Sequence, residues 1–189
     1  MALAPILVAV ALAAAQDPGA TPSPEVKEQV RALLGAIHGP VSPEAFRALG
    51  PGADEALAEV AREEGFPSRR LRALEALAGL GGARAEAVHR EVLASPTAPR
   101  AVRSGAARGL GQLAGPARAA AVLGPVLEQD RDPVVRAAAA EALAAAAPAD
   151  ACGRIRARAG AEAVPSRFAR ALTTCERADR AGAPGTPAR

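Results

Sequence analysis

Apolar residues recur every three or four positions along most of this chain, which is the spacing of one face of an α-helix. The first face of this kind consists of Val26, Val30, Leu33, Leu34 and Ile37. Proline and glycine, which interrupt helices, stand between successive runs. The pattern therefore predicts a series of helices joined by short turns.

Two further helices are predicted before residue 66. One begins at Ser42, whose hydroxyl can accept a hydrogen bond from the first helical turn, and Pro43 takes the first helical position. The other carries Leu57 and Val60 on its apolar face and ends near Gly65. The sequences of these helices diverge from the unit that follows them, which repeats more regularly.

This unit occurs three times, and such internal repeats decide the fold. The copies are residues 67–81, 99–114 and 132–147. Each contains an apolar residue followed by arginine, and these pairs are Leu71-Arg72, Val102-Arg103 and Val135-Arg136. The arginines are 31 and 33 residues apart, and residues 83–94 and 116–129 supply a partner helix between the copies. A recurrence of this kind is typical of stacked helix pairs that share one core.

The best-formed copy carries Asp-Pro-Val-Val-Arg at residues 132–136 and Glu-Ala-Leu at residues 141–143. This stretch resembles the HEAT repeat in its short, bacterial, lyase-like variety. The resemblance extends over residues 67–147 and, more loosely, over residues 25–66. It implies an all-α fold, an α-solenoid in which antiparallel helix pairs stack into a right-handed superhelix.

The resemblance also implies a role for the repeated residues. The repeat signature consists of Arg72, Arg103, Asp132, Val135 and Arg136. In the family, the arginine after the valine is a structural residue that bonds across repeats, often to the aspartate of a neighbour. The aligned arginines also allow a ladder that binds an anion, and the sequence leaves both interpretations open.

Composition supports helices and limits the possible functions. Of the residues, 50% are apolar, mostly alanine, whereas the chain has no Trp or Tyr and only 3 Phe. Alanine favours helices, and strands favour β-branched and aromatic residues. No nucleic-acid partner is expected, because no aromatic stacking platform is interleaved with the arginines.

The charge is unevenly distributed along the chain. Residues 1–66 carry 9 acidic and 4 basic residues, and residues 67–189 carry 11 acidic and 19 basic residues, so the net charges are −5 and +8. A basic C-terminal part can steer an acidic protein partner toward it. Solvated helix faces produce the same pattern, so that interpretation also stays open.

The N-terminus has the character of an export signal. Residues 1–15 contain no charged side chain and end in Ala13-Ala14-Ala15, which fits the small residues before a signal-peptidase site. The run is too short for a membrane-spanning helix, which needs about 20 residues. We expect a cleaved signal peptide and a periplasmic or secreted protein. An uncleaved signal that anchors the chain in the membrane is the alternative.

Composition also predicts the ends of the folded domain. Pro, Gly, Ser and Thr dominate residues 16–24, which we expect to form a flexible linker. The helical domain is expected over residues 25–178. Residues 179–189 have little to bury and are expected to form a disordered tail.

The chain has two cysteines, Cys152 and Cys175. They fall in predicted helices over residues 149–159 and 165–178, and the midpoint of the two positions lies in the turn between these helices. Residues equidistant from the turn of an antiparallel hairpin lie side by side, so we expect a structural disulfide in the last helix pair. Two free thiols, or a metal or redox pair, are the alternatives. Zinc has little support, because no Cys-x-x-Cys spacing or nearby His is present.

The sequence contains no motif for catalysis, a cofactor or a metal. His38 and His89 are isolated, and the adjacent acids Asp54 and Glu55 point in different directions on a helix. We therefore expect a non-catalytic scaffold that binds a protein partner. A lyase-related or chromophore-handling protein is the alternative, as is a stabilising module without a partner of its own.

Overall fold

The computed structural model describes residues 21–35 and 42–182, and every regular element in these residues is helical. In chain order the elements are α1 (Pro24–Gly35), α2 (Pro43–Arg47), α3 (Ala53–Arg62), α4 (Pro67–Leu80), α5 (Gly82–Ala94), α6 (Arg100–Leu113), α7 (Pro116–Gln129), α8 (Pro133–Ala146), α9 (Pro148–Gly160), the 3-10 turn η1 (Pro165–Phe168) and α10 (Ala169–Gly182). Within the described part of the chain, no helix is long and apolar enough to cross a bilayer. The all-α expectation is confirmed.

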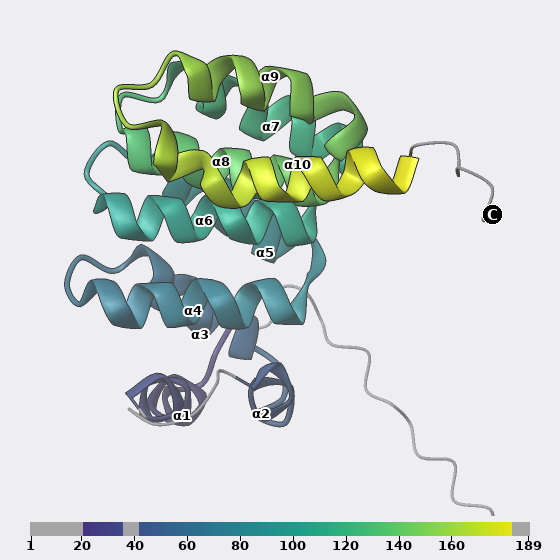
Figure 1. Ribbon diagram of the computed structural model, residues 1–189. Coiled ribbons are helices and arrows are strands. Elements are labelled where there is room, and N and C mark those ends of the chain that lie inside the picture. The colour runs from purple at the N-terminus through teal and green to yellow at the C-terminus, as the bar shows by residue number, and fades with distance from the viewer. Residues whose placement is uncertain (1–20, 36–41, 183–189) are drawn as a thin grey trace, which may run out of the picture.

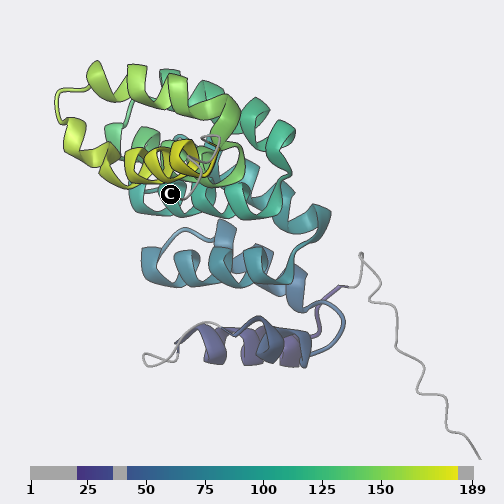
Figure 2. The same ribbon diagram turned by 45° about the vertical axis from the view of Figure 1, so that its right-hand side comes forward.

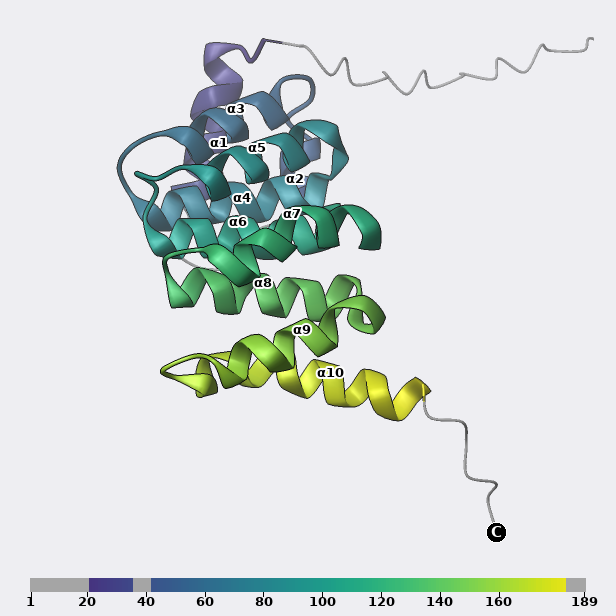
Figure 3. The same ribbon diagram turned by 90° about the horizontal axis from the view of Figure 1, so that it is seen from above.

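The helices form two layers along a stack. In Figure 1 α4 and α6 lie toward the viewer with α3 and α5 behind them, and α10 lies in front of α8. From α3 onward each odd-numbered helix packs on the even-numbered helix that follows it, and α4, α6, α8 and α10 pack on one another in turn. Figure 2 shows the stack rise from α1 and α2 to α9 and α10, and Figure 3 shows the same progression from above. The chain is an α-solenoid of helix pairs, as the repeats predict.

The core of the even-numbered layer repeats every 33 residues. Its buried positions are Ala73, Ala106 and Ala139, followed one turn later by Leu77, Leu110 and Leu143. The alanines allow neighbouring helices to approach closely, and the leucines fill the space between the two layers. Each helix pair therefore buries its apolar face only against its neighbours in the stack.

Local chemistry sets the helix ends. The Ser42 hydroxyl accepts a hydrogen bond from the backbone N–H of Ala45 at the start of α2, as the sequence predicts. At the end of α4 the chain turns at Gly81, whose φ of 79° lies in the left-handed region that glycine adopts without strain. The next helix then begins at once, and α5 packs chiefly on α6.

Both predicted domain boundaries shift in the structure. Helix α10 continues to Gly182, and its Asp179 forms an ion pair with Arg156 of α9, so residues 179–182 of the predicted tail are helical. At the other end Pro22 is buried against Gly52, where a Cβ would lie 2.8 Å from the Pro22 Cα atom. The last residues of the predicted linker therefore pack on the domain. The predicted signal peptide at 1–15 lies outside the described residues.

A disulfide joins Cys152 of α9 to Cys175 of α10, with the Cα atoms 5.6 Å apart and both side chains buried. This is the pairing that the sequence predicts from the symmetry of the two positions about the turn. Closing a loop of this length stabilises a fold by about 3 kcal/mol in the chain-entropy model. The bond holds the last helix pair that the structure describes, which packs on α7 and α8.

Candidate functional site

In each of the three helices α4, α6 and α8 the fourth residue is an arginine. Its guanidinium group donates a hydrogen bond to a backbone carbonyl at the C-terminal end of the preceding helix. These bonds join Arg70 to Ala61 O at 2.9 Å, Arg103 to Leu93 O at 2.9 Å and Arg136 to Asp130 O at 2.6 Å. Carbonyls at a helix C-terminus have no partner within their own helix, so each arginine satisfies an orphan acceptor. Its charge also lies at the negative end of the helix dipole.

Two of these arginines also bind an acidic residue of the next helix pair. In both cases the acidic residue lies in the turn after the first helix of that pair. Arg103 forms an ion pair with both carboxylate oxygens of Asp130, and Arg136 binds those of Glu162 at 2.6 and 2.7 Å. The Asp130 and Glu162 side chains are only 8% and 4% exposed. Because a buried charge is costly without its partner, each pair ties a repeat to its neighbour. An anion could bind these arginines only by displacing a buried carboxylate.

The structure corrects the first position of the repeat signature. The sequence assigns it to Arg72, but Arg70 is the residue that contacts the preceding helix. The reason is that α4 begins at Pro67, so that its fourth residue is Arg70, 33 positions before Arg103. Arg72 lies two residues further, roughly 200° around the helix, and faces elsewhere. Its Nε atom is buried without a hydrogen-bond partner among the described residues.

The structure also corrects the expected role of Asp132. The resemblance implies that this aspartate bonds to an arginine of a neighbouring repeat. Instead its carboxylate accepts the backbone N–H of Val134 at 2.8 Å and caps α8, because it occupies the N-cap position of that helix. Asp130, two residues earlier, is the partner of Arg103. Val135 is buried in the core.

Other residues singled out in the sequence form no reactive group. Asp54 and Glu55 both pair with Arg84 of α5, so they link neighbouring repeats rather than form an acid–base dyad. His89 is completely buried, and His38 lies outside the described residues. Across residues 21–35 and 42–182, no three His, Cys, Asp or Glu side chains come together in a way that could hold a metal ion.

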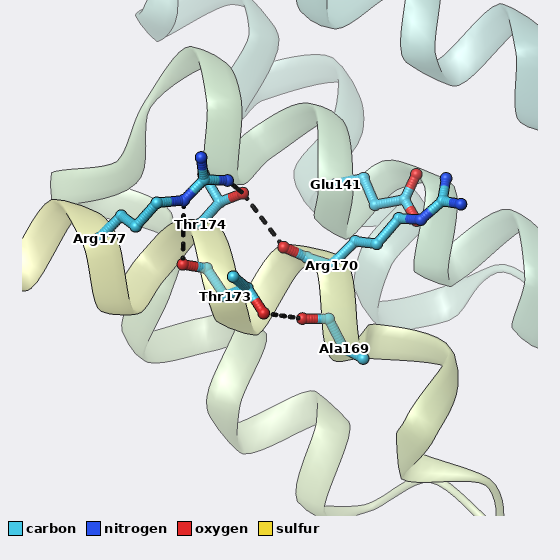
Figure 4. Close-up of a pocket in the computed structure, with 6 residues that line it drawn as sticks. All are labelled: Glu141, Ala169, Arg170, Thr173, Thr174 and Arg177. Atoms are coloured by element: carbon cyan, nitrogen blue, oxygen red, sulfur yellow. Dashed lines mark hydrogen bonds between the residues drawn. The ribbon is translucent and has the colours of Figure 1, made fainter.

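An open pocket of about 440 Å³ lies between α8 and the terminal helix α10 (Figure 4). Its lining residues on α10 include Arg170 and Arg177, which are two helical turns apart, with Thr173 and Thr174 between them. Glu141 of α8 completes the wall. The sequence shows the arginines, but no motif in it distinguishes these two from the others.

The pocket has an excess of available positive charge. Arg177 is held by hydrogen bonds to Thr173 O at 3.4 Å and to Thr174 Oγ1 at 3.1 Å, which Figure 4 shows as dashed lines. Arg170 forms no ion pair with a described residue, whereas Glu141 is already paired with a cation of α6 at 3.0 Å. The two guanidinium groups can therefore receive an anionic group such as a carboxylate.

Comparison with known families agrees with the repeats seen in the structure. Residues 54–144 match the family model for HEAT repeats. This part of the chain consists of HEAT repeats. Repeats of this family are generally protein-interaction modules, and their helical stacks are typical of scaffolds without catalytic activity. No curated protein and no solved structure matches the chain.

The buried pair between Arg136 and Glu162 predicts a loss of stability in acid. The Arg136 guanidinium lowers the pKa of Glu162 against the opposing effect of burial. Below about pH 4.3, the ordinary pKa of glutamate, the unfolded chain therefore binds a proton that the folded chain does not. The stabilisation from this pair is complete above that pH and is lost as the pH falls through the folded-state pKa.

Urea unfolding between pH 6 and pH 3 measures this effect. The unfolding free energy of the wild-type protein is expected to fall more steeply with decreasing pH than that of Glu162→Gln. Glu176→Gln, a substitution at an exposed glutamate of α10, is the matched control and should follow the wild type. Parallel curves for the wild type and Glu162→Gln would contradict the assignment.

Proposed function

We propose that this protein is an exported HEAT-repeat scaffold without catalytic activity, and that it binds an acidic segment of a protein partner between α8 and α10. The observation that carries the proposal is the pocket lined by Arg170 and Arg177. A solenoid end of this kind offers a surface of fixed shape, because its helices are held by the stack and by the disulfide. No cofactor or metal is part of the proposal.

The distribution of charge supports an acidic partner. Residues 148–182 carry 7 arginines and 4 acidic residues, and two of those acids, Glu162 and Asp179, are already paired with arginines. Residues 1–66, which include α1 and α3, carry instead 9 acidic and 4 basic residues. A partner with a run of carboxylates is therefore attracted to the α10 end of the stack and repelled from the other end.

Two features of the chain support export. Residues 1–15 have the uncharged, apolar character and the small terminal residues of a signal peptide. The disulfide between Cys152 and Cys175 belongs to a class of bond that persists in oxidising compartments and is rare in the cytosol. Together they favour a periplasmic or secreted location.

Charge reversal at the pocket tests the partner chemistry. Binding of a decaglutamate peptide to the full-length protein, measured by fluorescence anisotropy at low salt, is expected to weaken at least tenfold in Arg170→Glu/Arg177→Glu. It should also weaken steeply with added salt, because the attraction is electrostatic. The same double variant should fail to retain the partner that the wild-type protein retains from an envelope fraction.

A matched control separates the pocket from net charge. Arg90→Glu/Arg100→Glu makes the same change in net charge at two exposed arginines of α5 and α6, away from α10. This control is expected to bind the peptide nearly as well as the wild type. Equal losses in the two double variants would show that binding follows overall charge, and the pocket would lose its proposed role.

Fractionation tests the location. In the source cell, the protein is expected in the soluble envelope fraction, with a mature N-terminus at Gln16 and with Cys152 and Cys175 protected from alkylation until a reductant is added. A membrane-bound chain that retains residues 1–15 supports the anchored alternative. A cytosolic chain with residues 1–15 retained and two free thiols would contradict export.

A further inference from the structure

The two arginines of the pocket between α8 and α10 lie seven residues apart on one helix. An α-helix rises about 1.5 Å per residue, so the Cα atoms of Arg170 and Arg177 lie about 10 Å apart along α10 and nearly on the same face. Long side chains of a helix lean toward its N-terminus, and Figure 4 shows both arginine side chains running in the same direction. The two guanidinium groups therefore stay about as far apart as the backbone positions that carry them.

Hydrogen bonds hold the guanidinium group of Arg177 in this position. Its Nε atom donates to Thr173 O, and its Nη2 atom donates to Thr174 Oγ1. With both bonds in place the group stays over its own helical turn and does not swing toward Arg170. A guanidinium group has five N–H donors, so further donors of Arg177 are left for a ligand. The pocket thus has two separate anion anchors rather than one.

The side chains between the two anchors offer hydrogen-bond acceptors. The Thr173 hydroxyl donates its proton to Ala169 O at 2.9 Å, and the Thr174 hydroxyl donates to Arg170 O at 3.1 Å. Glu141, on the α8 wall, is a carboxylate that only accepts. A ligand carboxylate placed midway between the arginines would face these acceptors and the charge of Glu141. The pocket therefore favours an acidic group at each anchor and an uncharged stretch between them.

The distance between the anchors selects the conformation of a bound segment. A polyproline II helix has three residues per turn and rises about 3.1 Å per residue, so acids three positions apart lie on one side, about 9 Å apart. In a β-strand, residues three positions apart point to opposite faces. An α-helix places acids seven positions apart at a similar distance, but its diameter of about 10–12 Å is large for a pocket of about 440 Å³.

We propose that the pocket recognises a polyproline II segment of the partner in which two uncharged residues separate two acidic ones. One carboxylate binds Arg170 and the other binds Arg177 through charge-assisted hydrogen bonds, and the uncharged residues pass over Thr173 and Thr174. The pattern rests on the proposed function, because it applies to the same pocket and the same acidic partner. The pocket then selects among acidic segments by the spacing of their charges, in addition to attracting them.

Competition with labelled decaglutamate tests the spacing. Three capped octapeptides, each with six prolines and two glutamates, have the same charge and the same polyproline II conformation. Their glutamates are one, two or three positions apart. Fluorescence anisotropy with the full-length protein at low salt is expected to show that spacing three competes about fivefold better than the other two, because it engages both arginines at once. Equal competition by the three peptides, or competition by none of them, overturns the proposal.

An α-helical competitor tests the conformation. An alanine-rich helical peptide with glutamates seven positions apart presents two carboxylates at about the same distance as the spacing-three peptide. It is expected to compete more weakly than that peptide, because a helix lies over the rim of the pocket instead of entering it. Stronger competition by the helical peptide would overturn the polyproline II assignment.

Moving one anchor tests whether the arginines set the spacing. Thr174→Arg/Arg177→Thr exchanges two residues of α10, which keeps composition and net charge but places the arginines four positions, or about 6 Å, apart. Arg170→Gln, at an exposed position, removes one anchor. In both variants the preference for spacing three is expected to disappear. If either folded variant keeps the full preference, the two arginines do not read the spacing.

The decaglutamate experiment separates the proposed spacing from the proposed function. If decaglutamate binds through Arg170 and Arg177 while the three octapeptides compete equally, the pocket binds acidic segments without selecting their spacing, and only the spacing fails. If decaglutamate does not bind, or binds equally well to Arg170→Glu/Arg177→Glu, the proposed function fails as well.

Discussion

The stack depends on guanidinium groups that bind the open C-terminal ends of helices. Arg70, Arg103 and Arg136 each reach from the first turns of one helix to a carbonyl at the end of the helix before it. Each bond fixes the two helices of a pair relative to each other. The ion pairs of Arg103 with Asp130 and of Arg136 with Glu162 then connect that pair to the next one. The even-numbered helices can therefore keep a 33-residue period although the odd-numbered ones vary from 10 residues in α3 to 14 in α7.

Much of this fold follows from local sequence, because apolar spacing, capping residues and the symmetric cysteines act over short stretches of chain. The position of the contacting arginine in the first full repeat does not follow from local sequence. Around Arg69-Arg70-Leu71-Arg72 the apolar–arginine pattern matches Arg72, and only the start of α4 places Arg70 at the contact. Glu162 stands in a turn without a motif, 26 residues after Arg136, so only the packed structure pairs them.

The chain departs from its own repeat at two places. Helices that only stack need an alanine or leucine at each buried position, and most of them have one. His89 and Gly109 break this rule together, because the buried ring of His89 takes the space that a side chain at position 109 would fill. Among the described residues α10 is the last helix of the stack, and it presents Arg170 and Arg177 to a pocket. This pocket has no sequence motif, because it is formed by residues on separate helices.

The central claim is that Arg70, Arg103 and Arg136, and not Arg72, hold the repeats together. Urea unfolding of Arg103→Met and Arg72→Met, at neutral pH and with the disulfide intact, tests it most directly. Arg103→Met leaves the Asp130 carboxylate buried without its partner, which is expected to lower the unfolding free energy by about 3–5 kcal/mol. Arg72→Met removes no ion pair with a described residue and is expected to cost less than about 1 kcal/mol. Equal losses in the two variants, or a larger loss in Arg72→Met, would contradict this account.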